Sequence, residues 1–268
     1  MNHFLLNQNQ LLEKNKMKKK IVIFSGAGLD RESGVLTFRD CKDGLWNNHK
    51  IDDVATPEGW SRDRSKVLDF YNERRRQMPE VHPNDAHIAL TALEEEYDVI
   101  HVTQNVSDLL ERAGATNVIH LHGELTKART SFGMNNPKLI ESQHVYNIGY
   151  DDIKLGDLDE EYEAQLRPHI VWFGEYPFGV DKAYQAFKEA DIVLIIGTSL
   201  NISYTIGFFG VTKLESPIIY IDPEPSRDLD NSYRELKIEY ITKGAVDGVQ
   251  EVIDRLITQE IGSDKNDK

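Results

Sequence analysis

Residues 21–34 read IVIFSGAGLDRESG, so that four apolar residues pass directly into a loop with three glycines. An apolar run of this length is typical of a buried parallel strand. Glycines after such a strand let the backbone approach a phosphorylated ligand, and the next helix points its free N–H groups at the anion. The common dinucleotide fingerprint has a further glycine three residues after Gly28, where this chain has Arg31. The loop therefore indicates a nucleotide site of another kind or, without a ligand, a tight strand-to-helix turn.

The composition is that of a globular protein with a sizeable core and an acidic balance of charge. Of 268 residues, 40% are hydrophobic, and 31 Lys and Arg against 45 Asp and Glu give a formal net charge of −14. That balance disfavours nucleic acid and anionic membranes as partners, because both attract basic patches. No apolar run reaches the length of a membrane span, no secretory signal is recognised, and the single cysteine, Cys41, excludes an internal disulfide. We therefore expect a cytoplasmic protein, and the sequence does not determine its oligomeric state.

Strand-like and helix-like patterns alternate along the chain. Apolar strand patterns lie at 99–103, 118–121, 191–196 and 217–222. Such alternation predicts a parallel sheet with right-handed crossovers. The segments that follow the predicted strands would then share one edge of the sheet, and they are 25–34, 104–105, 122–123, 197–199 and 222. We predict an α/β fold, with a Rossmann-type parallel sheet, helices on both of its faces and a smaller inserted domain.

Three polar residues near this edge are candidates for chemistry or for structure. His122 stands before a glycine and outside the apolar run, so it is a candidate general base. His120 alternates inside the strand and is interpreted as structural. Asp222 ends a strand, at a position where an acid is a usual partner for ribose hydroxyls.

A helical pattern over 61–78 places Tyr71 and Arg74 three residues apart on one face. A Tyr hydroxyl and an Arg guanidinium on one face can hold a carboxylate. The alternative is that 74–76, three consecutive arginines, forms a solvated run on a surface helix. Periodicity alone favours that alternative.

Taken together, these motifs resemble the signature of the sirtuins. The resemblance spans about 20–257 and is carried, in chain order, by Gly26-Ala27-Gly28, Glu32-Ser33-Gly34, Thr37-Phe38-Arg39, Thr103-Gln104-Asn105, His122-Gly123, Phe173-Gly174-Glu175 and Gly197-Thr198-Ser199. Further stretches are similar to the bacterial class III branch, which removes acidic acyl groups from lysine. These stretches are 53–58, Tyr71 with Arg74, 111–114 and 166–169.

The resemblance implies an NAD-dependent protein-lysine deacylase, a desuccinylase or demalonylase with deacetylation as a second activity. Acyl-lysine and NAD would meet between a Rossmann-type NAD-binding domain and a small domain, giving lysine, nicotinamide and acyl-ADP-ribose. Asn105 would orient the ribose and a water, and His122 would act as general base on a ribose hydroxyl. Tyr71 and Arg74 would bind the distal carboxylate of the acyl group.

By the same resemblance, the residues that bind NAD would be Gly26, Ala27, Gly28, Glu32, Thr37, Phe38, Arg39, Trp46, Gln104, Asn105, Ser107, Gly197, Thr198, Ser199, Asp222, Pro223, Glu224 and Ala245. The substrate would be held by Tyr71, Arg74, Val171, Phe173, Gly174 and Glu175, the last four pairing with its backbone as an added strand. The NAD-binding domain would comprise 17–40, 84–125 and 168–260. The small domain would comprise 41–83 and 126–167, with a flexible extension at 1–16 and a mobile tail at 261–268.

The chain departs from the sirtuin pattern in three ways that bear on chemistry. The two usual Cys-x-x-Cys pairs are missing, because 126–167 contains no cysteine, so we predict no zinc and a module held by its own packing. Ser107 stands where the family carries an acid near the nicotinamide carboxamide. Asp30 replaces a small residue of the glycine loop, and an acid beside a pyrophosphate is unfavourable unless Arg31 or Arg39 offsets it.

Two other functions stay open on the sequence. An NAD glycohydrolase or ADP-ribosyltransferase on the same scaffold would also use Asn105 and His122, whereas Tyr71 and Arg74 favour deacylation. A module that binds NAD or ADP-ribose with little turnover is the third hypothesis, and Asp30 and Ser107 motivate it.

Overall fold

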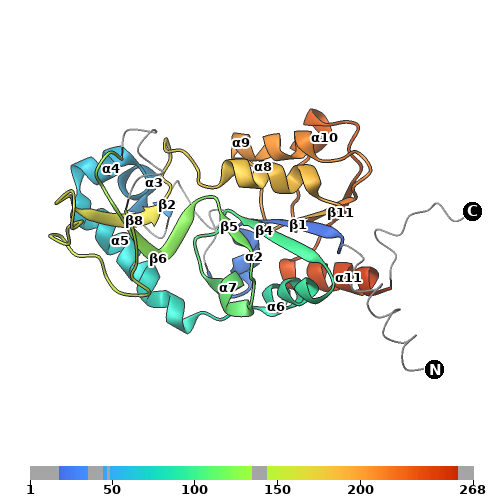
Figure 1. Cartoon of the computed structure of the whole chain (residues 1–268), viewed down its shortest axis with the longest axis horizontal. Coiled ribbons are helices and arrows are strands. Elements are labelled where there is room, and N and C mark those ends of the chain that lie inside the picture. Colours follow the sequence, from blue (N-terminus) through green and yellow to red (C-terminus); the bar gives the residue numbers. More distant parts are fainter. Residues whose placement is uncertain (1–17, 36–44, 47–48, 135–143, 259–268) are drawn as a thin grey trace, which may run out of the picture.

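The computed structural model describes residues 18–35, 45–46, 49–134 and 144–258 of the chain (Figure 1). Within this part, six strands form one sheet in the order β11-β10-β9-β1-β4-β5, and every neighbouring pair is parallel. The strands are β1 (Lys20–Ser25), β4 (Asp98–Thr103), β5 (Val118–His120), β9 (Ile192–Ile196), β10 (Ile218–Ile221) and β11 (Ile238–Ile241). The predicted parallel α/β sheet is confirmed.

The strand order reverses between β1 and β9. From β1 the chain first builds outward through β4 and β5, and then returns to build the other side through β9, β10 and β11. Open α/β sheets bind ligands at such a switch point, outside the carboxyl ends of the strands. The glycine loop after β1 and the loop after β9 therefore lie at the place where a ligand is expected.

Helices cover both faces of this sheet (Figure 1). One side carries α2 (Ala27–Arg31), α6 (Asp85–Ala92), α7 (Leu109–Ala113) and α11 (Ala245–Ile257), and the other carries α8 (Val180–Glu189), α9 (Ser203–Ile206) and α10 (Asp228–Ser232). Alternate residues of β1 enter two different cores, since Ile21 and Ile23 pack in one and Val22 and Phe24 in the other. An apolar run without alternation is what a strand buried on both faces requires.

A smaller module packs at one end of the sheet around a third core that contains Trp60, Tyr71 and Trp172 (Figure 1). Its helices are α3 (Ile51–Val54), α4 (Pro57–Arg62) and α5 (Arg64–Gln77), and its strands are β2 (Leu45–Trp46), β3 (His49–Lys50), β6 (Gly123–Thr130), β7 (Val145–Asn147) and β8 (Leu166–Ile170). Across the described residues of both parts, 3-10 helices are found at Met78–Glu80, Leu93–Glu95 and Gly207–Val211.

Two elements differ from the sequence-based expectation. The region 126–167, for which the sequence predicted no strands, contributes to an antiparallel sheet in the order β7-β6-β8. The strand β11 was not predicted, because its sequence, IEYI, alternates over only four residues. The predictions for 1–16, 37–39 and 261–268 lie outside the described residues, and the proposed domain limits stay a prediction.

A buried carboxylate, that of Asp159, joins several segments of the small module. The Asp159 side chain accepts hydrogen bonds from the Tyr146 hydroxyl (2.8 Å) and from the backbone N–H of Tyr162 (2.8 Å) and Glu161 (3.1 Å). The Nδ1 atom of His144 lies 3.0 Å from the same carboxylate. In the part of the chain that the structure describes, no three His, Cys, Asp or Glu side chains gather as metal ligands would.

The helices within these described ranges were also compared with the length and hydropathy that a bilayer demands. None of them is long and apolar enough to cross a membrane.

Candidate active site

The loops after β1 and β9 touch backbone to backbone. The N–H of Gly26 donates to the carbonyl of Ile196 (3.0 Å), and the N–H of Gly28 donates to the carbonyl of Gly197 (2.8 Å). A Cβ atom on Gly28 would lie 2.5 Å from the Cα of Gly197, which is too close for any side chain. The contact between the loops is therefore enough to require glycine at position 28. The backbone N–H groups of Gly26 and Gly28 belong to the segment that was predicted to bind NAD, and both donate to the neighbouring loop.

Glu32 lies beside the start of helix α11. Its Oε1 accepts a hydrogen bond from the backbone N–H of Val246 (3.0 Å), in the first turn after Ala245. A carboxylate at this position stabilises the helix, because the first N–H groups lack partners within the helix and carry partial positive charge. A structural reason for Glu32 therefore exists, and contact with the cofactor stays a prediction.

The loops after β4 and β9 are joined by side chains. The Thr198 hydroxyl donates to the Gln104 amide oxygen (2.8 Å) and accepts from the N–H of Leu200 (3.2 Å). Leu200 has a φ of +56°, a left-handed conformation that is uncommon outside glycine. Ser199 between them is half-buried.

At the end of β10, Asp222 is buried and accepts a hydrogen bond from the N–H of Glu224 (2.8 Å). This bond forms a local turn, and the turn leaves Pro223 and Glu224 exposed. The ends of β1, β4, β9 and β10 therefore all deliver predicted site residues to one edge.

His122 is held between two hydrogen-bond partners from different elements. Its Nδ1 lies 3.0 Å from the backbone carbonyl of Gln104, and its Nε2 lies 2.8 Å from the hydroxyl of Tyr204. A carbonyl only accepts, so Nδ1 carries the proton and Nε2 presents a lone pair that the Tyr204 O–H meets. Burial lowers the pKa of His122, with the Gln104 carbonyl acting in the opposite sense. The ring is thus a neutral base, with its reactive nitrogen on the side of Tyr204.

Sequence reasoning missed Tyr204. None of the motifs considered in the sequence includes it. The signal that could have found it is its position one loop after the end of β9, because that edge also holds His122.

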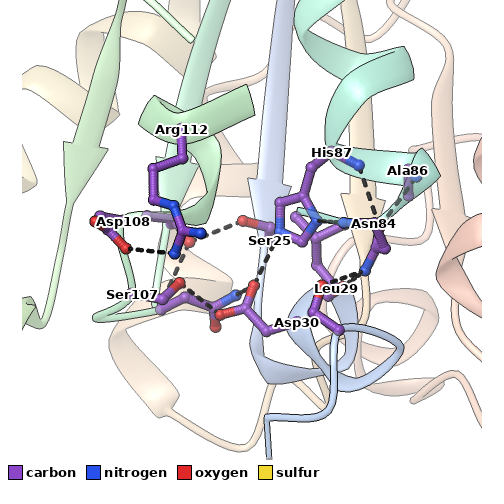
Figure 2. A network of polar contacts seen from close by, with 12 residues as sticks. Ser25, Leu29, Asp30, Asn84, Ala86, His87, Ser107, Asp108 and Arg112 are labelled. Atoms are coloured by element: carbon purple, nitrogen blue, oxygen red, sulfur yellow. Dashed lines mark hydrogen bonds and ion pairs between the residues drawn. The ribbon is translucent and has the colours of Figure 1, made fainter. Parts of the chain in front are cut away.

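Asn105 and Ser107 meet the carboxylate of Asp30 in a buried network. Figure 2 shows Ser107 and His87 on either side of this carboxylate. The Asn105 Nδ2 donates to Asp30 Oδ1 (2.7 Å), and the Ser107 hydroxyl donates to Asp30 Oδ2 (2.6 Å). His87, on α6, places its Nε2 at 3.2 Å from the same carboxylate. Asp30 and Ser107 are the positions at which the chain departs from the sirtuin pattern, and both are hydrogen-bonded within this network.

His120 is structural, as interpreted from its alternation. Its Nδ1 lies 3.0 Å from the Asn105 carbonyl oxygen and its Nε2 lies 2.7 Å from Glu111. Burial acts to lower the pKa of His120, but the bond to Glu111 outweighs it and raises the pKa. The two histidines of this strand end thus differ in their partners, a carboxylate for His120 and a hydroxyl for His122.

Tyr71 and Arg74 both lie in α5, and Tyr71 is fully buried. The indole N–H of Trp172 donates to the Tyr71 hydroxyl (3.1 Å). The Arg74 guanidinium lies over the ring of Phe70, 3.3 Å from its centroid, and donates to the Phe70 carbonyl (2.8 Å). Trp172 directly precedes Phe173, so Tyr71 lies beside the stretch that was expected to receive substrate.

The stretch predicted to bind substrate, 171–175, uses part of its own hydrogen-bonding capacity within the protein. The backbone N–H groups of Val171, Phe173 and Glu175 donate to the carbonyls of His122, Ala55 and Trp172. The Glu175 carboxylate is buried and receives Arg167 at 2.6 Å and Arg129 at 3.0 Å. Glu175 therefore has a structural charge partner on each side, whereas Phe173 and Gly174 face solvent.

The geometry leaves part of the predicted NAD site undescribed. Thr37, Phe38 and Arg39 lie outside the described residues, and of Trp46 only the backbone pairing of β2 is described. The donors and acceptors that are described nevertheless suit a dinucleotide, because backbone atoms approach at the switch point while an amide, an imidazole and an acid stand around it.

Fold and site together define a doubly wound α/β protein whose polar residues gather at the switch point of its sheet. A model of the Sir2 family matches residues 26–204. An "NAD-dependent protein deacylase" from Helicobacter pylori is 43% identical over 239 residues, which cover 89% of this chain and 98% of the relative. A protein of the same name from Aggregatibacter actinomycetemcomitans is 49% identical over 210 residues, covering 78% and 96%.

Solved structures agree. A Sir2 homologue in complex with NAD has a TM-score of 0.76 at 29% identity, covering 94% of each chain. A variant of a Sir2 homologue in complex with ADP-ribose has a TM-score of 0.76 at 29% identity, covering 94% of this chain and 97% of the other. The chain belongs to the Sir2 family.

Proposed function

We propose that this protein is an NAD-dependent deacylase of lysine side chains in proteins. The proposal rests on the protonation state and position of His122. Its imidazole is neutral, and the lone pair of its Nε2 lies at the sheet edge. Asn105 directly follows Gln104, whose carbonyl accepts the hydrogen bond from Nδ1. Relatives named NAD-dependent protein deacylase, and Sir2 homologues that bind NAD and ADP-ribose, support the same activity.

Bound NAD supplies an electrophilic ribose carbon when its nicotinamide departs. His122 would accept a proton from a ribose hydroxyl that takes the place of the Tyr204 hydroxyl at Nε2, while Gln104 holds the other ring nitrogen. The contribution of Asn105 is to hold the ribose and a water by its side-chain oxygen. The proton on Nε2 makes His122 a cation, and the Gln104 carbonyl stabilises that cation by accepting from Nδ1.

We propose that acidic acyl groups are preferred, with acetyl as the second substrate. The Trp172 indole uses a lone pair of the Tyr71 hydroxyl, so the phenolic proton can be donated to an acyl carboxylate. Burial raises the pKa of Tyr71, which keeps that proton in place. The guanidinium of Arg74, three residues along the same helix, supplies the positive charge.

A single assay tests the proposed activity against its alternatives. The protein is incubated with NAD and a succinyl-lysine peptide, and nicotinamide and acyl-ADP-ribose are measured by mass spectrometry. Nicotinamide release that depends on the peptide, with acyl-ADP-ribose formed, is the expected result. Release without peptide would instead support an NAD glycohydrolase, and binding of NAD without release would support a binding module.

The partners proposed are acylated proteins, because an acyl-lysine must reach the site from outside the chain. A cytoplasmic setting is likewise a proposal, and it rests on the single cysteine of the sequence.

A further inference from the structure

The carboxylate of Asp30 is buried, at 4% exposure, in the first turn after the glycine loop. Burying an ionised carboxylate costs several kcal/mol unless hydrogen bonds and charges compensate it. Three side chains from other parts of the chain approach it: Asn105 (2.7 Å), Ser107 (2.6 Å) and His87 (3.2 Å). Ser107 and His87 can be followed in Figure 2.

All three approaching groups are donors. The backbone N–H of Asn84 donates to Nδ1 of His87 (3.3 Å), so the proton of the neutral ring sits on Nε2 and faces Asp30. An amide N–H and a hydroxyl complete the set. The pocket is thus built for a group that only accepts hydrogen bonds, which is a carboxylate in its ionised form.

This arrangement fixes the orientation of the Asn105 amide. Its Nδ2 donates both to Asp30 and to the backbone carbonyl of Gly26 (3.0 Å). Neither partner can donate, so a flipped amide would place its oxygen against two acceptors. The two hydrogens of Nδ2 are therefore both used inside the protein, and Oδ1 is the atom left to meet a ligand.

Asp30 and Ser107 are also the two positions at which the chain departs from the sirtuin pattern around this loop. That pattern has a small residue at 30 and an acid at 107, whereas this chain has the acid at 30 and a small hydroxyl at 107. The two side chains touch at 2.6 Å. At these two positions together the chain therefore still holds one carboxylate and one hydroxyl, joined by a hydrogen bond.

We propose that Asp30 is a positioning residue for the nicotinamide-ribose half of the site, and that its carboxylate takes over the role of the acid expected at 107. This inference rests on the proposed function. Asp30 locks Asn105 with its oxygen toward the ligand, and it places a negative charge next to the ribose, where positive charge develops as nicotinamide leaves. One carboxylate is required at this contact, and two would repel each other at hydrogen-bond distance.

The test compares four proteins: wild type, Asp30→Ser, Ser107→Asp, and the double variant Asp30→Ser/Ser107→Asp. The expected kcat for NAD at saturating acyl-peptide falls roughly tenfold or more in each single variant. The first lacks the carboxylate and the second has two in contact. The double variant is expected to recover to within about threefold of wild type, because it again holds one carboxylate and one hydroxyl donor.

Calorimetry supplies a readout that does not depend on turnover. ADP-ribose lacks nicotinamide, so its affinity for Asp30→Ser should stay equal or rise, while the affinity for NAD falls. The double variant should restore the ratio of the two affinities. A merely structural role for Asp30 would lower the melting temperature of every variant and weaken both ligands alike.

The outcomes separate the inference from the proposed function. A double variant no better than the worse single variant, in both kcat and the NAD-to-ADP-ribose affinity ratio, overturns the inference. Wild type that releases no nicotinamide in the presence of acyl-peptide overturns the proposed function, and the affinity ratios then decide the inference. If Asp30→Ser does not fold, Asp30→Asn, which keeps the shape, serves with the same readouts.

Discussion

At the scale of single residues, the state of His122 is set by two hydrogen bonds rather than by a charged partner. Within the described structure, its hydrogen-bond partners are the Gln104 carbonyl and the Tyr204 hydroxyl, and neither is a carboxylate. His120, two residues earlier, pairs with Glu111 and has a raised pKa, whereas the pKa of His122 is lowered by burial. A base that stays neutral to lower pH suits a reaction near neutrality.

The lowered pKa of His122 predicts the pH dependence of the reaction. The acid limb of kcat/KM should have its midpoint below about 6.5, the ordinary value for histidine, because the base must be unprotonated. The Tyr204→Phe variant removes a donor that favours the neutral ring, so its acid limb should move to higher pH by up to about one unit. Steady-state rates from pH 5 to 9 measure both, and a limb that moves to lower pH would contradict the assigned tautomer.

Arg74 should decide between acyl groups. The Arg74→Met change removes the cation but keeps an unbranched side chain, so desuccinylation should fall about 10- to 100-fold while deacetylation changes little. Rates with succinyl- and acetyl-lysine peptides of one sequence give the comparison. Arg76→Met is the matched control, since Arg76 lies on the same helix and pairs with Asp152 at the surface. Equal loss of both activities at Arg74 would count against its carboxylate role.

At the scale of elements, helix α5 shows what periodicity alone does not reveal. Periodicity alone favoured the alternative that 74–76 is a solvated run, and this alternative is wrong for Arg75, which is fully buried. Arg75 donates to the Leu125 carbonyl and to Asn72, both at 2.6 Å, and thereby joins α5 to β6. Burial lowers its pKa to about 10. The Leu125 carbonyl belongs to a residue 50 positions further along the chain, so the sequence gives no local sign of this bond.

The small module should depend on Asp159 for its stability. Asp159→Ala removes acceptors from the Tyr146 hydroxyl and from two backbone N–H groups, and should lower the free energy of unfolding by about 3 kcal/mol. Denaturant unfolding followed by tryptophan fluorescence measures the change. Asp151→Ala, at an exposed position of the same module, is the control and should have little effect.

The environment of Asp159 also leads to a prediction about how stability depends on pH and to one about the effect of a chelator. Burial acts to raise the pKa of Asp159, but the hydrogen bonds from Tyr162 and Tyr146 outweigh it and lower the pKa. Its contribution is therefore complete above about pH 4, the unfolded value, and is lost as the pH falls through the folded pKa. If the hydrogen bonds to Asp159 suffice to hold the module, a chelator should leave the melting temperature of wild type unchanged. A melting temperature that falls with the chelator would reveal a metal in the module.

At the scale of the whole molecule, the sequence was sufficient for five of the six strands of the sheet and for the edge where their loops meet. Apolar runs such as 21–24 and 192–196 are determined by burial on both faces, which is a local and readable signal. The role of Asp30 could not be predicted, since it depends on Asn105, Ser107 and His87, more than fifty residues away. Tyr204 was missed for the same reason, because its partner His122 precedes it by 82 residues.

The contact between the two halves of the sheet gives the last prediction. In Gly28→Ala the new methyl group would lie 2.5 Å from the Gly197 backbone, so the loops after β1 and β9 must separate. Stability should fall by about 1–3 kcal/mol, and NAD affinity should fall with it, since both loops belong to the proposed site. Gly156→Ala is the control: its φ of +95° makes alanine strained, but the space around it is open and it lies in the small module. Both variants should lose stability. Only Gly28→Ala pushes the loops apart, so only this variant should also lose affinity for NAD, which calorimetry measures.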